Sequence, residues 1–118
     1  MARILIIDDS SFQRRIVRGM LTPEGYEIVE ASNGAEGLAQ AGNGIDCVLL
    51  DLIMPEMDGF AVLEALHRDR PGLPSIVLTA DIQDATRRQC LALGARGFLN
   101  KPPQRDALLA AVRELLAR

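Results

Sequence analysis

The sequence predicts an α/β fold in which a parallel sheet is covered by helices on both faces. Short apolar runs recur along the 118 residues at spacings of roughly 20 to 30 residues, and each is followed by a helical pattern. The runs within Arg3–Ile7 and Cys47–Leu50 do not alternate between apolar and polar residues, which is typical of strands buried on both faces. Strand–helix units of this kind, joined by right-handed crossovers, predict a single doubly wound (βα)5 domain spanning residues 1–118.

The first strand–helix unit and the second strand occupy the start of the chain. The run within Arg3–Ile7 ends at two aspartates, and Ser10 or Ser11 can cap the helix that follows them. One face of this helix is expected to carry the apolar residues Phe12, Ile16, Val17, Met20 and Leu21. Residues 26–31 alternate apolar and charged side chains, which indicates an edge strand with one more solvated side.

The middle of the chain supplies a short helix, the central strand and a longer helix. Asn33 and the glutamate three residues later resemble a capping box, which opens the short helix. The central strand is Cys47–Leu50, and Pro55 excludes a helix directly after it. The next helix is therefore expected from Asp58 to about Arg68. Its apolar stripe consists of Phe60, Val62, Leu63 and Leu66.

The remaining residues contain the last two strand–helix units. Ser75–Leu78 is a buried strand, and a helix begins at residue 83 or 84 and ends just before Gly94, a left-handed cap. Gly97–Asn100 is a short fifth strand, and the last helix covers about residues 104–117. These patterns fit the flavodoxin-like strand order 2-1-3-4-5, in which the alternating second strand lies at an edge and strands one and three are neighbours.

Composition is typical of a soluble globular domain. Hydrophobic residues make up 48% and charged residues 25%, and no apolar run approaches the ~20 residues of a membrane span. The start of the chain lacks a signal-peptide pattern, so we expect a cytoplasmic protein without a membrane partner. The net charge of −3 and the aromatic content of 3% argue against direct binding to nucleic acid. Cys47 and Cys90 lack metal-ligand spacing and are expected to be buried free thiols.

Two common nucleotide-binding motifs do not occur in the sequence. The first expected strand is not followed by Gly-x-Gly-x-x-Gly, and the chain contains no Gly-x-x-x-x-Gly-Lys-Ser/Thr. A dinucleotide site is therefore disfavoured, and P-loop nucleotide binding is excluded.

Polar side chains follow the ends of four of the expected strands. The first strand ends at Asp8 and Asp9, the third at Asp51, the fourth at Thr79 and the fifth at Lys101. In the order 2-1-3-4-5 these residues converge on one crevice at the carboxyl edge of the sheet. Two carboxylates about 4 Å apart repel by ~4 kcal/mol at an effective dielectric of ~20, so three together need a cation or protonation. Hard oxygen ligands without histidine or thiolate favour Mg²⁺ over zinc.

The two other groups in this crevice suit the oxygens of a phosphoryl group. Thr79 adds a hydroxyl donor and Lys101 an ammonium group. Asp51 is then a candidate nucleophile that would form an aspartyl phosphate. For Asp51 taken alone, the simpler interpretation of a solvated aspartate after a strand stays open.

Taken together, these residues resemble a receiver domain of two-component signalling, the CheY-like family. The likeness covers the whole chain. It is carried by Asp8-Asp9, by Asp51 with Met54-Pro55-x-x-Asp58-Gly59, by Thr79-Ala80 and by Lys101-Pro102. Each motif alone is weak, whereas the whole set in this order, at the ends of successive strands, is specific.

The resemblance implies a phosphorylation-dependent signalling switch rather than an enzyme, with autodephosphorylation only incidental. Asp51 would accept phosphate from the phosphohistidine of a sensor histidine kinase or phosphotransfer protein. A Mg²⁺ ion would be held by Asp8, Asp9, Asp51 and the backbone carbonyl of Ile53. Phosphorylation would change the surface that binds a downstream protein effector.

The resemblance also implies roles for residues at the last two strands. Thr79 and Lys101 would contact the phosphoryl group, and Thr79 and Phe98 would form the switch pair. A cis peptide before Pro102 is implied as well. The chain departs from the family at Phe98, which lacks the hydroxyl of the tyrosine often found there.

Two functions of other classes compete with this interpretation. A phosphatase of the haloacid dehalogenase type would need a second aspartate two residues after the nucleophile, where this chain has Ile53. A degenerate receiver that binds a partner constitutively would have lost an acid or the lysine, and none is missing. Asp58 is expected to be a helix cap with a minor role near the metal, and His67 an exposed helix residue rather than a phosphorelay histidine.

Overall fold

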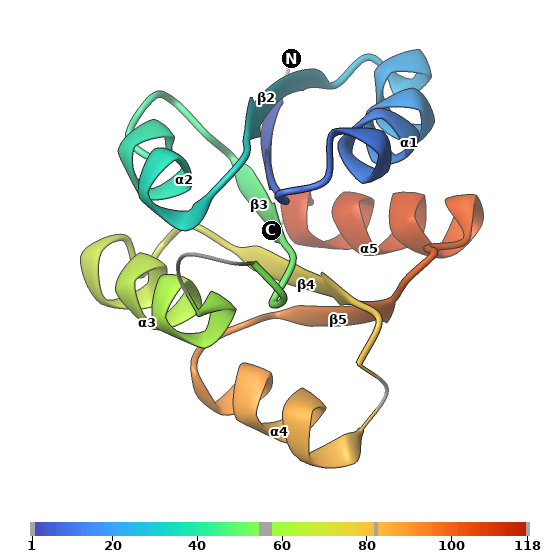
Figure 1. Ribbon diagram of the computed structural model, residues 1–118. Coiled ribbons are helices and arrows are strands. Elements are labelled where there is room, and N and C mark those ends of the chain that lie inside the picture. Colours follow the sequence, from blue (N-terminus) through green and yellow to red (C-terminus); the bar gives the residue numbers. More distant parts are fainter. Residues whose placement is uncertain (1, 55–57, 82, 118) are drawn as a thin grey trace.

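The computed structural model describes residues 2–54, 58–81 and 83–117, and it is built on a five-stranded parallel sheet (Figure 1). The strands are β1 (Arg3–Ile7), β2 (Glu27–Ala31), β3 (Cys47–Leu50), β4 (Ser75–Thr79) and β5 (Gly97–Asn100). Their order in the sheet is β2-β1-β3-β4-β5, and every neighbouring pair is parallel. The predicted fold class and strand order are confirmed.

Helices cover both faces of the sheet. Those in the described residues are α1 (Ser11–Leu21), α2 (Gly34–Gln40), α3 (Gly59–Asp69), α4 (Asp84–Ala92) and α5 (Arg105–Leu116), with a 3-10 turn, η1 (Thr22–Glu24), after α1. Figure 1 shows α1 and α5 on one face and α2, α3 and α4 on the other. None of the described helices is long and apolar enough to cross a membrane.

Two apolar clusters, one on each face, hold the three layers together. Successive side chains of a strand point to opposite faces, so β1 directs Leu5 and Ile7 toward α2, α3 and α4. It directs Ile4 and Ile6 toward α1 and α5. This burial on both faces explains the continuous apolar runs in the sequence. In β2, by contrast, only Ala31 is fully buried, as predicted for an edge strand.

Three helix starts are capped as the sequence predicts. Ser10 caps α1, Asn33 caps α2 and Asp58 caps α3. In each case a side-chain oxygen accepts a backbone N–H from the first turn of the helix. In α2 the Glu36 N–H donates to the Asn33 side chain, and the Glu36 carboxylate accepts a hydrogen bond from the Ser32 hydroxyl at 3.2 Å. The capping oxygens therefore set where these helices begin, close to the strand ends that precede them.

Both cysteines are buried free thiols, as predicted. Burial raises the pKa of the Cys47 thiol to about 12, with a smaller effect from the charge of Asp46. At neutral pH this thiol is therefore protonated, and its Sγ donates a weak hydrogen bond to the Val48 carbonyl at 3.9 Å.

Two loop predictions and one helix prediction have different outcomes. Gly94, with a φ of 109°, follows α4 in the left-handed conformation expected of a cap. His67 is an exposed residue of α3, as expected. Pro55, predicted to exclude a helix directly after β3, lies outside the described residues.

The predicted apolar face of α1 is wrong at its first turn. Phe12 is 63% exposed, whereas Val17 and Leu21 are buried and Ile16 and Met20 are half-buried. The first turn of α1 lies just beyond the end of β1, at the margin of the sheet. The core cluster on this face therefore begins only with the later turns of the helix.

Gly59, the first residue of α3, approaches the backbone of Leu52 too closely for a larger residue. A Cβ atom at Gly59 would lie 2.3 Å from the Cα of Leu52 and 2.6 Å from its carbonyl oxygen. We therefore expect Gly59→Ala to lower the free energy of unfolding by roughly 2 to 3 kcal/mol, measured by urea denaturation.

Gly19→Ala, in the exposed part of α1, is the matched control. Nothing lies within 4 Å of the Cβ position there. This substitution should raise the free energy of unfolding by about 0.5 to 1 kcal/mol, because alanine favours the helix. Equal stabilities of the two variants would contradict the close contact at Gly59.

Candidate functional site

The residues predicted to converge lie together at the carboxyl edge of the sheet. Hydrogen bonds extend the strand pairing one step beyond the strands. The Asp8 N–H donates to the last carbonyl of β2 at 3.1 Å, and the Asp51 N–H donates to the last carbonyl of β1 at 2.9 Å. The Lys101 N–H donates to the carbonyl of Thr79, the last of β4, at 2.9 Å. Because all strands are parallel, the residues that make these hydrogen bonds lie at the same edge of the sheet.

Asp8, Asp9 and Asp51 form the predicted carboxylate cluster. One oxygen from each lies within 4.8 Å of those from the other two. Asp8 and Asp51 are only 4% and 7% exposed, whereas Asp9 is exposed. At such separations two ionised carboxylates repel by up to ~4 kcal/mol at an effective dielectric of ~20. The cluster therefore requires positive charge or protons.

Lys101 supplies part of the positive charge. Its Nζ contacts Asp8 Oδ2 and lies 3.2 Å from Asp51 Oδ2, so a single ammonium bridges two carboxylates. The other oxygens accept backbone hydrogen bonds. Asp8 Oδ1 accepts from the Ser10 N–H at 3.0 Å, and Asp51 Oδ1 accepts from the Ile53 N–H at 3.2 Å. One ammonium thus faces three carboxylates, and the site keeps an excess of negative charge.

Burial raises the pKa of the Asp51 carboxyl above its ordinary value. The Lys101 ammonium and the Ile53 N–H oppose this shift, and the negative charge of Asp8 adds to it. The ionised form of Asp51 is therefore less stable than it would be in water. Oxygen donors without histidine or thiolate among them suit a hard cation, so the cluster fits the predicted Mg²⁺.

Thr79 is fully buried at the end of β4 and belongs to a hydrogen-bonded turn. Its Oγ1 accepts from the Asp81 N–H at 3.2 Å. The Asp81 carboxylate accepts from the Gln83 N–H at 2.9 Å and from the Thr86 hydroxyl at 2.8 Å, and these bonds hold the pKa of Asp81 below its ordinary value. The start of α4 at residue 83 or 84 is confirmed, whereas this role of Asp81 was not predicted from the sequence. An aspartate just before a helix is the signal that could have identified it.

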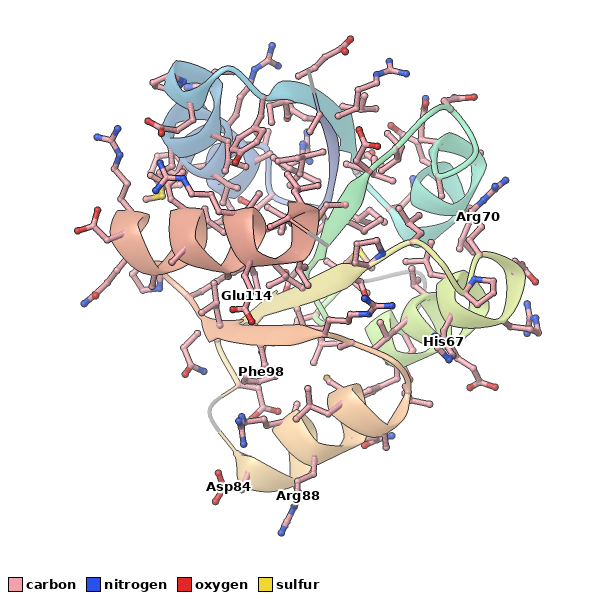
Figure 2. The ribbon with its side chains drawn as sticks, turned by 180° about the vertical axis from the view of Figure 1, so that it is seen from behind. His67, Arg70, Asp84, Arg88, Phe98 and Glu114 are labelled. Atoms are coloured by element: carbon pink, nitrogen blue, oxygen red, sulfur yellow. The ribbon has the colours of Figure 1, made fainter. Side chains whose placement is uncertain are left out.

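Phe98 lies on β5 opposite Val77 of β4, two residues along the strand from the level of Thr79. Its side chain is half-buried and packs against the apolar cluster on the face covered by α2, α3 and α4 (Figure 2). The Lys101–Pro102 peptide is cis, as the resemblance implied. The two residues predicted to form the switch therefore lie on paired strands.

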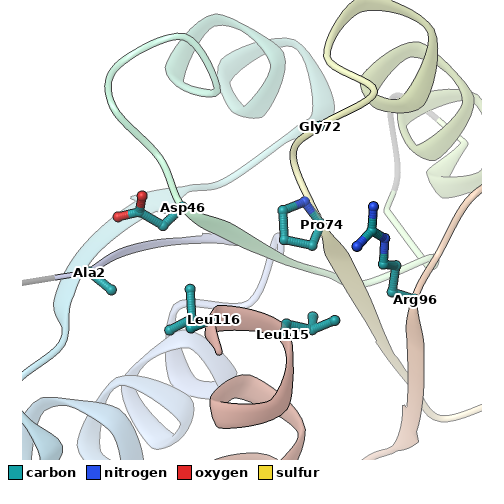
Figure 3. A pocket seen from close by; sticks show the side chains of 7 residues that line it. All are labelled: Ala2, Asp46, Gly72, Pro74, Arg96, Leu115 and Leu116. Atoms are coloured by element: carbon teal, nitrogen blue, oxygen red, sulfur yellow. The ribbon is translucent and has the colours of Figure 1, made fainter. Parts of the chain in front are cut away.

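A groove of about 470 Å³ lies at the opposite edge of the sheet (Figure 3). It is lined by residues that precede three strands: Asp46 before β3, Pro74 before β4 and Arg96 before β5. Leu115 and Leu116 of α5 complete its apolar part. None of the predicted site residues is among the residues that line this groove.

The substitution Asp51→Asn tests whether the negative charge of the buried Asp51 carboxylate lowers the stability of the fold. Asp51→Asn removes one of three negative charges, and at about pH 7 it should raise the free energy of unfolding of the metal-free protein by ~1 kcal/mol. The folded-state pKa of Asp51 is raised, so the wild-type protein loses stability relative to the variant as the pH rises through that pKa. The difference should vanish below the ordinary pKa of 3.8. Urea denaturation at several pH values measures it.

Asp69→Asn is the control for this experiment, because Asp69 is exposed and, among the described residues, forms its ion pair with its neighbour Arg68. Its effect should stay within about 0.5 kcal/mol. An Asp51→Asn variant less stable than wild type at about pH 7 would show that pairing with Lys101 outweighs the repulsion, contrary to expectation.

Comparison with known proteins agrees with this geometry. Residues 4–113 match the family model of the response regulator receiver domain. The chain is 35% identical over 120 residues to Protein PilH of Pseudomonas aeruginosa, and the match covers 99% of this chain and 99% of PilH. It is 38% identical over 118 residues to the transcriptional regulatory protein GlrR of Escherichia coli, covering 98% of this chain but 26% of GlrR.

Solved structures share the fold as well. The crystal structure of the CheX–CheY–BeF3–Mg²⁺ complex from Borrelia burgdorferi contains a chain that is 30% identical, with a TM-score of 0.93, over 99% of this chain and 90% of that one. Receiver domains are signalling switches rather than conventional enzymes, and they generally bind Mg²⁺ at an acidic cluster. The sequence match, the fold and the strand-end residues together show that this chain belongs to the response regulator receiver domain family of two-component systems, whose members act in phosphorylation-dependent signalling.

Proposed function

We propose that Asp51 accepts a phosphoryl group from the phosphohistidine of a sensor histidine kinase or a phosphotransfer protein. Phosphorylation then changes how the domain binds a downstream protein effector in the cytoplasm. One observation carries the proposal: the buried Asp51 carboxylate lies 3.2 Å from the Lys101 ammonium, within a cluster of three acids at one sheet edge. A carboxylate held in this way is a nucleophile placed next to a phosphate-binding cation.

The transfer exchanges one bond to phosphorus for another. A carboxylate oxygen of Asp51 forms a bond to phosphorus while the bond from phosphorus to the donor's histidine nitrogen breaks, and the imidazole leaves with that electron pair. The Lys101 ammonium faces the oxygens of the transferred group. Thr79 Oγ1 accepts a hydrogen bond from Asp81, so its own proton is still free to be donated to a phosphoryl oxygen.

Asp8, Asp9 and Asp51, with the backbone carbonyl of Ile53, are the proposed Mg²⁺ ligands. The ion would neutralise the crowded carboxylates and the charge on the transferred oxygens. Support comes from the spacing of the three carboxylates and from the raised pKa of Asp51. The similar Borrelia burgdorferi complex, which includes BeF3 and Mg²⁺, supports the same assignment by likeness.

The competing functions are less well supported by the site. Ile53, which is 62% exposed, stands where a phosphatase of the haloacid dehalogenase type needs its second aspartate. A constitutive binding module would not need a cluster of three acids whose oxygens lie within 4.8 Å of one another, nor a lysine that pairs with Asp8 and Asp51. Autodephosphorylation is incidental to the proposed switch. The net charge of −3 favours protein partners over nucleic acid.

The proposed switch couples Thr79 to Phe98. A phosphoryl group on Asp51 would draw the Thr79 hydroxyl toward it, and the space left behind Thr79 can be filled by an aromatic side chain of β5. Phe98 is half-buried and, unlike tyrosine, has no hydroxyl to satisfy when it moves further inward. The free-energy cost of the active-like state, with Phe98 inward, is therefore small before phosphorylation. A phosphoryl group can shift this equilibrium only by the difference in its interaction free energy with the two states.

Covalent chemistry provides the first test of this function. With acetyl phosphate and Mg²⁺, the protein should gain one hydroxylamine-labile phosphoryl group, detected by intact-mass spectrometry. Asp51→Ala should gain none. Asp46→Asn, which alters a carboxylate at the other end of the same strand, should react like wild type. An adduct of the same mass on Asp51→Ala would assign the nucleophile to another residue.

The switch predicts a graded set of responses to beryllofluoride, measured as effector affinity or by relaxation-dispersion NMR of residues 80–99. Phe98→Tyr should increase the ratio of the effector affinity with beryllofluoride to the effector affinity without it, by roughly two- to fivefold. A buried hydroxyl makes the inward state more costly in the unphosphorylated protein. Thr79→Ala should abolish the response, whereas Thr79→Ser, which keeps the hydroxyl, should preserve most of it. An intact response in Thr79→Ala would exclude this coupling.

A further inference from the structure

A series of charged side chains connects the edge strand β2, through α1, to the backbone of Asp8. The Arg14 Nη1 donates to the Asp8 carbonyl oxygen at 2.6 Å, and the Arg14 Nε donates to Glu30 Oε1 at 2.9 Å. Glu30 Oε2 also accepts from the Arg18 Nη1 at 2.7 Å. The Arg14 side chain is only 15% exposed, whereas that of Arg18 is 52% exposed. Arg14 is thus the partly buried member that reaches the site.

The carbonyl oxygen that Arg14 contacts belongs to the peptide between Asp8 and Asp9. A peptide unit is planar, so the Asp8 carbonyl and the Asp9 N–H move together as one rigid group. This peptide joins two of the proposed Mg²⁺ ligands. The Asp8 N–H, on the other side of the residue, donates to the Ala31 carbonyl of β2 at 3.1 Å. Asp8 is therefore held at both its N–H and its carbonyl, which restricts the directions in which both carboxylates leave the backbone.

We propose that Arg14 is a positioning residue of the phosphoryl-transfer site: it fixes the Asp8–Asp9 peptide so that both carboxylates are in place for Mg²⁺, and Glu30 orients Arg14. The inference rests on the proposed Mg²⁺ site and adds to it a residue that is not a ligand. Arginine suits this role because its planar fork donates to two acceptors in fixed directions at once. Lysine carries the same charge but lacks the fork.

Geometry and charge predict opposite results when Arg14 is replaced. A cation near three carboxylates competes with Mg²⁺ for them, so loss of the charge alone would strengthen Mg²⁺ binding. Loss of the hydrogen bond to the Asp8 carbonyl would weaken Mg²⁺ binding, because the ligands would no longer be held in place. Glu30 reduces the first effect, since its carboxylate already pairs with Arg14. The sign of the change therefore separates the two roles.

The test is the Mg²⁺ dissociation constant, measured by calorimetry with the metal alone. Arg14→Gln and Arg14→Lys should each bind Mg²⁺ about tenfold more weakly than wild type, a size typical of residues that orient metal ligands. Arg18→Gln is the matched control: it loses an ion pair with the same Glu30 but makes no contact with Asp8. Its Mg²⁺ affinity should stay within about twofold of wild type.

A second readout needs no metal. In the metal-free protein, the ¹⁵N chemical shift and hydrogen-exchange rate of the Asp9 amide report on the peptide that Arg14 holds. Both should change in the two Arg14 variants and stay unchanged in Arg18→Gln. If wild type binds no Mg²⁺ at millimolar concentration, the proposed metal site is wrong, and the Asp9 amide still decides whether Arg14 fixes this peptide.

Several results would overturn the positioning role. Mg²⁺ binding by Arg14→Gln that equals or exceeds wild type would do so, as would full recovery in Arg14→Lys, because charge rather than the fork would then matter. If circular dichroism shows that Arg14→Gln does not fold, Glu30→Gln replaces it. That variant keeps Arg14 but weakens its orientation, so Mg²⁺ affinity should fall about threefold. An unchanged affinity in Glu30→Gln would count against the proposal.

Discussion

Repulsion among Asp8, Asp9 and Asp51 is the constraint around which the carboxyl edge of this domain is arranged. A parallel sheet brings the ends of all its strands to one edge, so acids far apart in the chain become neighbours. Lys101, from the opposite end of the chain, contacts two of these acids and leaves the site with excess negative charge. That excess favours a cation, which together with Lys101 would let the edge accept the phosphoryl group of the proposed function.

The apolar layers on both faces of the sheet keep the three repelling carboxylates close together. The strands that carry the acids are buried on both sides, so their ends have little freedom to move apart. On the α3 side, Gly59 allows the helix to start directly against the backbone of Leu52, the residue after Asp51. The direction of the Asp51 side chain therefore depends on packing outside the site, as much as on its own hydrogen bonds.

The supports on the two sides of the site differ in character. On the β1 side, the partly buried Arg14 donates hydrogen bonds both to the backbone carbonyl of Asp8 and to the carboxylate of Glu30. On the β4 side, the Thr79 hydroxyl accepts a hydrogen bond from the Asp81 N–H in a turn that is held together by two bonds to the Asp81 carboxylate. The first arrangement suits groups that must stay fixed, namely the carboxylates. The second suits the proposed switch, in which the Thr79 hydroxyl would change partner on phosphorylation.

Sequence patterns predicted the strands, the helix caps, the strand order and the five polar residues at the carboxyl edge. These follow from apolar periodicity, capping chemistry and the common direction of parallel strands, which are local or topological properties. Only the tertiary structure showed that Phe12 is exposed, because a helical stripe does not reveal how far a helix extends past its sheet. The Arg14–Glu30 ion pair likewise joins α1 to β2, two elements that are not adjacent in the chain. Such contacts depend on side-chain rotamers and on distances between packed elements, neither of which a pattern of residue types contains.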